Sequence, residues 1–371
     1  MRYAIVLAIT GCIPEPTGLE QTWPPSLGIT VEAVTTGDLD GDGQPEILVY
    51  SSGDDHQAGI YAIEGHDDLA LGTATPIRAF DTFVPMAFAK PMAAAQGPAT
   101  DGTPLVYTSY VDKFHEVVVD TLSNQYGDNG PGFTDLPPGN ALLWLRPVRF
   151  PGNVVRVVVA NGSMMQHTAD DGDDARLIPA PNNGTWPTAI LATTYTTGSD
   201  AWTIVVATPS ELWHAPITTA GEFAWSSIRS GAAWAGQTAI DLDGDGREEI
   251  VGLDLVMHAL CAIDVVKLTT TCAPLGTTSP GTEISILAAH VAGSATVADL
   301  VVAQATGADT TISVIADVAF TGDTLTGTTM AMAPVSLAHG RAVVVNGGVG
   351  TPEAVLVFGT TGTVICAVGG C

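Results

Sequence analysis

Short apolar runs that end in turn residues recur along this chain, and their spacing limits the possible folds more than any other feature. The first residues of consecutive runs lie 58, 52, 47, 46, 50 and 55 positions apart. This period exceeds all but the longest helical repeats. The runs are Ile47–Gly53, Leu105–Thr108, Val157–Gly162, Ile204–Pro209, Ile250–Asp254, Leu300–Gln304 and Val355–Gly359. The chain is therefore expected to repeat one β unit seven times.

Each of these runs follows another apolar or alternating run, so each unit is predicted to begin as a hairpin. The preceding runs are Val31–Thr35, Met86–Lys90, Leu142–Leu145, Ile190–Tyr195, Thr238–Ile240, Ile284–Ala289 and Ala342–Val345. A third run follows in several units, at Ile60–Gly65, Leu212–His214, Ala259–Ile263 and Val364–Val368. Four strands in about 50 residues are typical of a propeller blade. The pattern predicts an all-β fold, a seven-bladed β-propeller of four-stranded antiparallel blades, over residues 28–371.

The last predicted unit ends after its third strand. The segment Gly18–Leu27 could supply the missing outer strand and so join the first and last blades, as in other propellers. The stretch before it, Ile13–Gly18, contains Pro14 and Pro16 and is interpreted as a tether.

The charge balance excludes one class of partner. The chain carries 12 Lys plus Arg against 39 Asp plus Glu, a formal net charge of −27. A nucleic-acid backbone or an anionic bilayer surface would repel it. The surplus favours metal cations or basic partners, although a solubilising acidic surface is the commoner explanation for such charges.

Two acidic loops, Asp38–Glu46 and Asp241–Glu249, share the pattern D-x-D-x-D-G-x-x-E. Calcium takes six to eight oxygen ligands, and alternate carboxylates around a glycine turn can supply them. The first site is predicted to use Asp38, Asp40, Asp42, the Gln44 carbonyl and Glu46; the second is predicted to use Asp241, Asp243, Asp245, the Arg247 carbonyl and Glu249. Without a cation, four crowded carboxylates should leave each loop poorly ordered.

These loops are not EF-hands, because the twelfth position is Val49 in one and Gly252 in the other, where an EF-hand has Glu. They resemble instead the FG-GAP, or VCBS, repeat of the integrin α-subunit propeller, with Glu in place of the final Asp. The resemblance implies that each loop joins the first two strands of a blade and binds calcium. The other units lack the three leading acids and are expected to be metal-free, and Asp170–Asp174 is interpreted as a solvated turn.

The N-terminus has the pattern of an export signal. Residues 4–9 are apolar, and Ile9-Thr10-Gly11-Cys12 resembles the bacterial lipobox. That resemblance implies a signal peptide over residues 1–11 and a lipid on Cys12. Because Ile13 follows the cysteine, resemblance to lipoprotein sorting in Gram-negative cells favours the outer membrane, at its periplasmic or cell-surface face. An ordinary signal peptide or a short strand is the alternative; a membrane span is excluded, since it needs about 20 residues.

Removing Cys12 leaves an even number of cysteines, as a disulfide framework in an exported chain would. Local pairing is the simplest arrangement: Cys261 with Cys272, and Cys366 with Cys371. The sequence has no Cys-x-x-Cys and no Cys-His cluster with zinc spacing.

No nucleophile, phosphate-binding or metallohydrolase motif is present in the sequence. The chain is therefore interpreted as an adhesion, protein-interaction or structural module and not as an enzyme, with an unknown protein or glycan outside the cytoplasm as its partner. Two alternatives stay open: a lectin-like propeller, and a polysaccharide hydrolase or lyase acting in the axial pocket. In the lectin-like case the sugar platform would come from Trp144, Trp202, Trp213, Trp225 and Trp234.

Overall fold

The computed structural model describes 31 segments between residues 21 and 368, mostly strands with some of their turns. They are 21–22, 29–31, 33–37, 46–52, 58–63, 75–79, 93–98, 104–111, 117–122, 132–134, 144–150, 154–160, 165–168, 176–181, 189–195, 202–208, 210–218, 223–230, 234–240, 242–243, 248–264, 267–274, 283–289, 299–306, 309–321, 324–330, 334–335, 337, 340–345, 353–359 and 364–368. Within these segments all regular structure is strand, and no helix suited to crossing a membrane occurs among them.

The described strands lie between residues 21 and 368. Their bounds are β1 Gln21–Thr22, β2 Ala33–Gly37, β3 Glu46–Ser52, β4 Ala58–Ile63, β5 Thr75–Ala79, β6 Ala93–Pro98, β7 Pro104–Val111, β8 Val117–Leu122, β9 Gly132–Thr134, β10 Trp144–Phe150, β11 Val154–Ala160, β12 Met165–Thr168, β13 Arg176–Ile178, β14 Ala189–Tyr195, β15 Trp202–Ala207, β16 Glu211–Ile217, β17 Ser226–Ser230, β18 Trp234–Ile240, β19 Glu249–Asp254, β20 Ala259–Asp264, β21 Thr269–Ala273, β22 Glu283–Ala289, β23 Asp299–Thr306, β24 Asp309–Thr321, β25 Thr324–Met330, β26 Pro334–Val335, β27 Arg341–Val345, β28 Ala354–Phe358 and β29 Val364–Val368.

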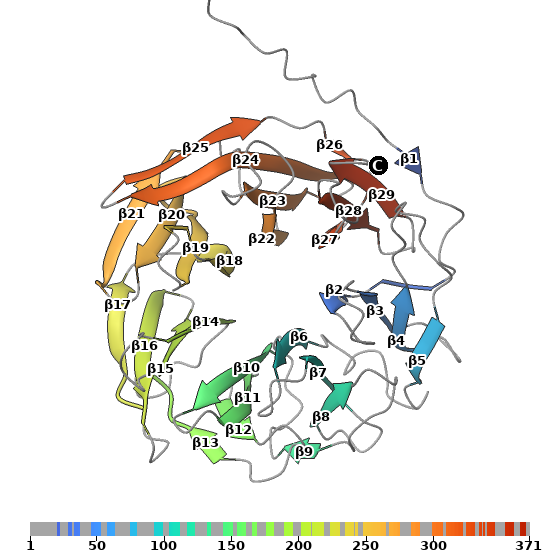
Figure 1. The fold of residues 1–371 in the computed structure, drawn as a ribbon, viewed down its shortest axis with the longest axis horizontal. Coiled ribbons are helices and arrows are strands. Elements are labelled where there is room, and N and C mark those ends of the chain that lie inside the picture. The colour runs from blue at the N-terminus through green and yellow to red at the C-terminus, as the bar shows by residue number, and fades with distance from the viewer. Residues whose placement is uncertain are drawn as a thin grey trace, which may run out of the picture.

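These strands form seven antiparallel sheets. Five sheets each contain four consecutive strands, β2 to β5, β6 to β9, β10 to β13, β14 to β17 and β18 to β21. The sixth contains β22 to β25, with the short β26 paired to β24, and the seventh contains β27, β28, β29 and β1. The first strand of each sheet contacts the first strands of the two neighbouring sheets, and β2 contacts β27. Figure 1 shows the sheets set around a common centre, with these first strands innermost.

Two residues of the segment predicted to supply the closing strand, Gln21–Thr22, form β1. β1 pairs antiparallel with β29, with Gln21 opposite Cys366 and Thr22 opposite Ile365. The first strand of the described chain therefore completes the last sheet, and Figure 1 shows β1 beside β29 at the edge of the molecule.

Each of the seven repeated runs begins within the second strand of its sheet, but one predicted hairpin partner is wrong. Met86–Lys90 was expected to pair with the run that begins at Leu105, and the structure pairs β6 with β7 instead. The segment Ala93–Pro98 is rich in Ala and lacks β-branched residues, so its sequence gives little strand signal. Pairing with β7 decides its conformation. The strand expected at Leu142–Leu145 is β10, which is shifted toward the C-terminus.

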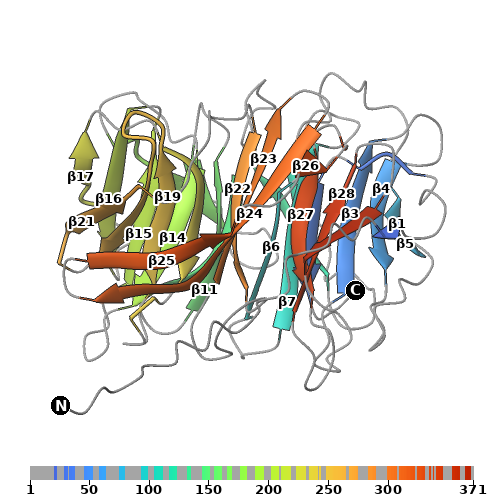
Figure 2. The ribbon, with the colours of Figure 1, turned by 90° about the horizontal axis from the view of Figure 1, so that it is seen from above.

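Buried apolar side chains hold neighbouring sheets together. Among the described residues, five such clusters each lie between two adjacent sheets. Because strand side chains alternate between faces, the second strands contribute to two clusters. In β28, Leu356 and Phe358 pack toward β3 and β4, whereas Val355 and Val357 pack toward β23 and β24. Figure 2 shows the sheets standing side by side, so that each can be covered on both faces.

A glycine in β18 allows two sheets to approach closely. The strand has a bulge between Ala235 and Thr238, and Gly236 within it has a φ of 61°. A Cβ at this position would lie 2.6 Å from Cγ2 of Ile284 in β22. The residue must therefore be Gly for both backbone and packing reasons.

Gly236→Ala should lower the free energy of unfolding by about 2–4 kcal/mol, because it combines an unfavourable left-handed backbone with overlap against Ile284. Urea denaturation measures this loss. Thr238→Ala, in the same strand, is the matched control and should cost much less. Equal stability of Gly236→Ala and the parent chain would show that this close approach is absent.

Candidate metal-binding loops

Both acidic loops join the first and second strands of a sheet, as the resemblance implied. One connects β2 to β3 and the other connects β18 to β19. Of the predicted ligands, the structure describes Glu46, Asp243 and Glu249. The remaining ones lie outside the described residues: Asp38, Asp40, Asp42, Gln44, Asp241, Asp245 and Arg247. The described residues show how the base of each loop is built.

The closing glutamates of the two loops occupy the same structural position. Glu46 begins β3 and lies opposite Gly37, and Glu249 begins β19 and lies opposite Ile240. Their exposed fractions are only 5% and 3%. A buried carboxylate needs a cation or several hydrogen-bond donors to offset its lost hydration. The two loops therefore share a buried anionic group at the base of a hairpin.

At the second loop, Glu249 also fixes the incoming chain. Its Oε2 accepts a hydrogen bond of 2.9 Å from the backbone N–H of Leu242. The Leu242 side chain is buried, whereas the next residue, Asp243, is exposed. The loop thus enters with its apolar residue turned into the protein and its acid turned outward. Glu249 has a structural task in addition to any contact with a cation.

The donor set of each loop fits calcium and not a softer metal. The predicted ligands are carboxylate and carbonyl oxygens, which suit a hard cation. The described residues alone contain no group of three His, Cys, Asp or Glu placed to hold a metal ion. In the second loop they do supply the exposed acid Asp243 and the buried carboxylate of Glu249, which lie on either side of Asp245 and Arg247 in the sequence.

Sequence reasoning missed the role of Asp299. This residue begins β23, the position in its sheet that Glu249 has in β19, and it is fully buried. Its Oδ1 accepts a hydrogen bond of 2.9 Å from the backbone N–H of Asp317, which has a φ of 51°. A spacing of 18 residues gave no local motif to detect. The acid at this position therefore holds backbone in a sheet without the three leading acids.

Two more buried acids in the β18 to β21 sheet fix turns. Oδ1 of Asp254 accepts hydrogen bonds from the N–H groups of Val256 and Met257, each 2.9 Å long. Oδ1 of Asp264 accepts one of 2.9 Å from Lys267 N–H, and its Oδ2 lies 2.5 Å from the Lys267 ammonium. These carboxylates satisfy turn backbone, as Asx side chains commonly do.

The predicted pair Cys261 and Cys272 forms a disulfide. The two residues lie opposite each other in β20 and β21, with their Cα atoms 4.0 Å apart. Cys366 lies in β29, and Cys371 is outside the described residues. The bond therefore joins the third and outer strands of the sheet that carries the second acidic loop.

The described tryptophans make packing contacts. Trp213 and Trp225 pack against the cluster between the β10 to β13 and β14 to β17 sheets. The Trp225 ring stacks on Phe223 at 6.0 Å, and its Nε1–H donates a 2.9 Å hydrogen bond to the Pro179 carbonyl. The side chains of Trp144, Trp202 and Trp234 lie outside the described residues, as do Cys12 and Asp170–Asp174.

Two histidines in neighbouring sheets are also enclosed by the fold. His167 is buried between the Phe150 and Phe223 rings, and its Nδ1 accepts a 2.5 Å hydrogen bond from Arg156 Nε. In β16, burial lowers the pKa of His214 below its ordinary value of 6.5, since desolvation disfavours the imidazolium. Its buried Nε2 has no hydrogen-bond partner within the described part of the chain.

Comparisons with known proteins place the chain by fold. No protein-family model matches it, and no curated protein matches it. It is similar to the solved structure of BBS1N in complex with ARL6DN, at 13% identity and a TM-score of 0.55, over 92% of this chain and 93% of that chain. A variant of the Synechocystis apocarotenoid oxygenase matches at 11% identity and a TM-score of 0.49. The match covers 76% of this chain and 68% of that chain. A mutant of AofleA from Arthrobotrys oligospora matches at 11% identity and a TM-score of 0.47. The match covers 85% of this chain and 89% of that chain.

The likeness to BBS1N, which is a β-propeller, concerns the fold alone. Together with the described strands, it shows an all-β chain whose structural neighbour is a propeller. The ligands and activities of these proteins do not transfer at such identities.

Variants of Glu249 separate its structural task from metal binding. In EGTA, Glu249→Leu should lower the free energy of unfolding by about 1–3 kcal/mol, because the buried Leu242 N–H loses its acceptor. Glu249→Gln keeps an acceptor oxygen and should cost less. Asp243→Asn, at the exposed neighbour, is the control and should be close to neutral. Urea denaturation gives the three values, and equal losses for the Leu and Gln variants would exclude a contribution from this hydrogen bond.

Proposed function

We propose that this chain is a calcium-stabilised β-propeller of seven four-stranded antiparallel blades, of the FG-GAP or VCBS type, that acts as an adhesion, protein-interaction or structural module. The observation that carries the proposal is the equivalence of the two acidic loops. Identical D-x-D-x-D-G-x-x-E patterns each end in a buried Glu that begins the second strand of a sheet. Seven sheets whose first strands contact one another in sequence support the blade count.

In this proposal Asp38–Glu46 and Asp241–Glu249 each hold one calcium ion. Calcium would supply the positive charge that offsets the crowded carboxylates, and six to eight oxygens would surround it. The protein's own part is to hold the loop ends: each closing glutamate is fixed in a strand, and Leu242 is fixed by Glu249. In this proposal calcium stabilises the folded chain and takes no part in a catalysed reaction.

A binding role agrees with what the described acidic and aromatic side chains do, because they hold backbone groups or pack between sheets. The described acids Glu249, Asp254, Asp264 and Asp299 all hold backbone groups. The described Trp225 and Phe223 are likewise used for packing between sheets. Recognition of a protein or glycan partner is therefore assigned to connecting loops, which carry binding residues in many scaffolds. The net charge of −27 disfavours nucleic acid as that partner.

The site of action is proposed to be outside the cytoplasm, at the outer membrane. The lipobox-like Ile9-Thr10-Gly11-Cys12 supports acylation of Cys12, and Ile13 supports the outer-membrane destination. The Cys261–Cys272 disulfide agrees with an oxidising compartment. Several acyl chains, each adding roughly 0.8 kcal/mol per buried CH₂, would hold the protein there.

Calcium should raise the melting temperature of the purified chain relative to EGTA. A ligand that binds only the folded state at 100 times its Kd stabilises it by about 2.7 kcal/mol per site. Asp40→Asn and Asp243→Asn should each remove part of the shift, and the double variant should remove most of it. Calorimetry in calcium, magnesium and EGTA measures these shifts. Identical melting in calcium and EGTA would refute the proposed calcium sites.

A further inference from the structure

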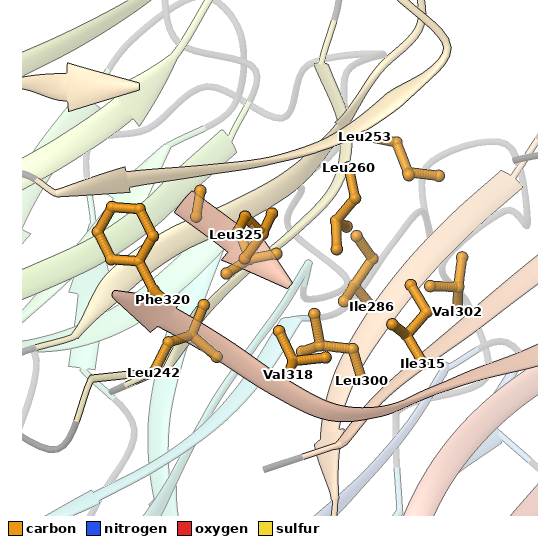
Figure 3. Packing of buried hydrophobic residues seen from close by; sticks show 12 residues of the cluster. Leu242, Leu253, Leu260, Ile286, Leu300, Val302, Ile315, Val318, Phe320 and Leu325 are labelled. Atoms are coloured by element: carbon orange, nitrogen blue, oxygen red, sulfur yellow. The ribbon is translucent and has the colours of Figure 1, made fainter. Parts of the chain in front are cut away.

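Leu242 connects the second acidic loop to the neighbouring sheet. Its side chain is 8% exposed and belongs to a buried cluster with residues of β19 and β20 and of the β22 to β25 sheet. Figure 3 shows Leu242 at the end of this cluster where Phe320 of β24 lies, with Leu325 of β25 nearby. The residue between two predicted calcium ligands in sequence therefore packs under the next sheet.

The part of the next sheet that covers Leu242 is a long two-stranded ribbon. β24 has 13 residues, and its pairing with β25 shifts at a bulge between Ala316 and Ala319. Beyond the bulge, Phe320 lies opposite Leu325, and both are buried. We name residues 318–321 of β24 and 324–327 of β25 the ribbon. In Figure 1, β24 and β25 extend toward the sheet of β18 to β21, and β25 contacts its outer strand β21.

The direction of the ribbon is set at its bulge. Asp317, with its φ of 51°, donates its backbone N–H to the buried Asp299. Val318 follows at once and is buried in the same cluster as Leu242. One end of the ribbon is thus fixed by an acid of its own sheet, whereas its apolar side chains share a buried cluster with Leu242 of the second acidic loop.

We propose that Leu242, Phe320 and Leu325 are positioning residues of the second calcium site, so that calcium in Asp241–Glu249 orders the ribbon of the next sheet. This inference rests on the calcium binding proposed above. Without the cation, repulsion among the loop carboxylates strains the chain on both sides of Leu242. Glu249 still holds the Leu242 N–H, but the strain shifts the Leu242 side chain within its cluster. The displaced side chain leaves Phe320 and Leu325 without a close-packed partner, which close-packed interiors tolerate poorly.

The sheet that follows the first acidic loop has a shorter third strand, as far as the structure describes it. Leu39 has the position in that loop that Leu242 has in the second. In the following sheet, however, the third strand β8 has 6 residues, against 13 in β24. The proposed coupling of calcium to a second sheet is therefore assigned to the second loop, which precedes the sheet with the long β24.

Hydrogen exchange of the unmodified chain tests the coupling directly. On replacing calcium with EGTA, peptides covering residues 309–330 should exchange about tenfold faster or more, because a coupling of this kind is typically 5–150-fold. Peptides covering 189–217, in a sheet without an acidic loop, should not change. Unchanged exchange at 309–330, while peptides of 241–249 respond to calcium, would overturn the inference. If 241–249 also fails to respond, the calcium site itself is refuted.

Linkage requires the reverse effect, since coupling between two sites is reciprocal. In an Asp40→Asn background, which leaves the second loop as the predicted site, Phe320→Leu and Leu325→Ala should each weaken calcium binding about tenfold in isothermal titration. Val256→Ser, at a hairpin tip that is 66% exposed, is the control and should leave affinity unchanged. Affinity unchanged in both ribbon variants would contradict a positioning role. Far-UV circular dichroism of each variant shows that the sheets persist.

Discussion

Apolar packing between adjacent sheets is the interaction on which the rest of this structure depends. Second strands such as β19 and β28 are buried along their whole length, and their alternate side chains serve two different clusters. Burying a Val, Leu or Ile side chain contributes about 1.5–3 kcal/mol, so each sheet depends on both of its neighbours. Isolated sheets of this kind would expose two apolar faces. The sequences of the connecting loops are less constrained by this packing than those of the strands.

An acidic residue at the start of the second strand connects two of these sheets to backbone outside the regular ladder. Glu249 holds the N–H of Leu242, and Asp299 holds the N–H of Asp317 in the next sheet. Both carboxylates are buried, and each fixes backbone outside the regular ladder. At the proposed calcium loops this position would also serve a cation, whereas Asp299 serves a backbone donor; both partners offset the lost hydration of a carboxylate. Sheets with and without a proposed calcium loop can therefore share one architecture.

The sequence predicted the repeat, the second strands, the closing strand and the local disulfide, because each depends on short-range pattern or simple counting. It misplaced the partner of β7, since Ala93–Pro98 forms a strand through pairing and not through propensity. It could not show that Asp299 holds Asp317, nor that Leu242 and Phe320 belong to one buried cluster. Both arrangements join residues far apart in sequence, and no local motif encodes them. The acidic loops could be recognised from the sequence because the predicted ligands of each loop lie within nine residues.

The central claim, that the two acidic loops hold calcium in a propeller, can be tested most directly by a crystal structure of the chain grown with calcium. The account predicts one ion in Asp38–Glu46 and one in Asp241–Glu249, each surrounded by six to eight oxygens at about 2.3–2.6 Å. Anomalous scattering distinguishes these ions from water. Well-ordered loops without an ion, at a calcium concentration that saturates comparable sites, would contradict it.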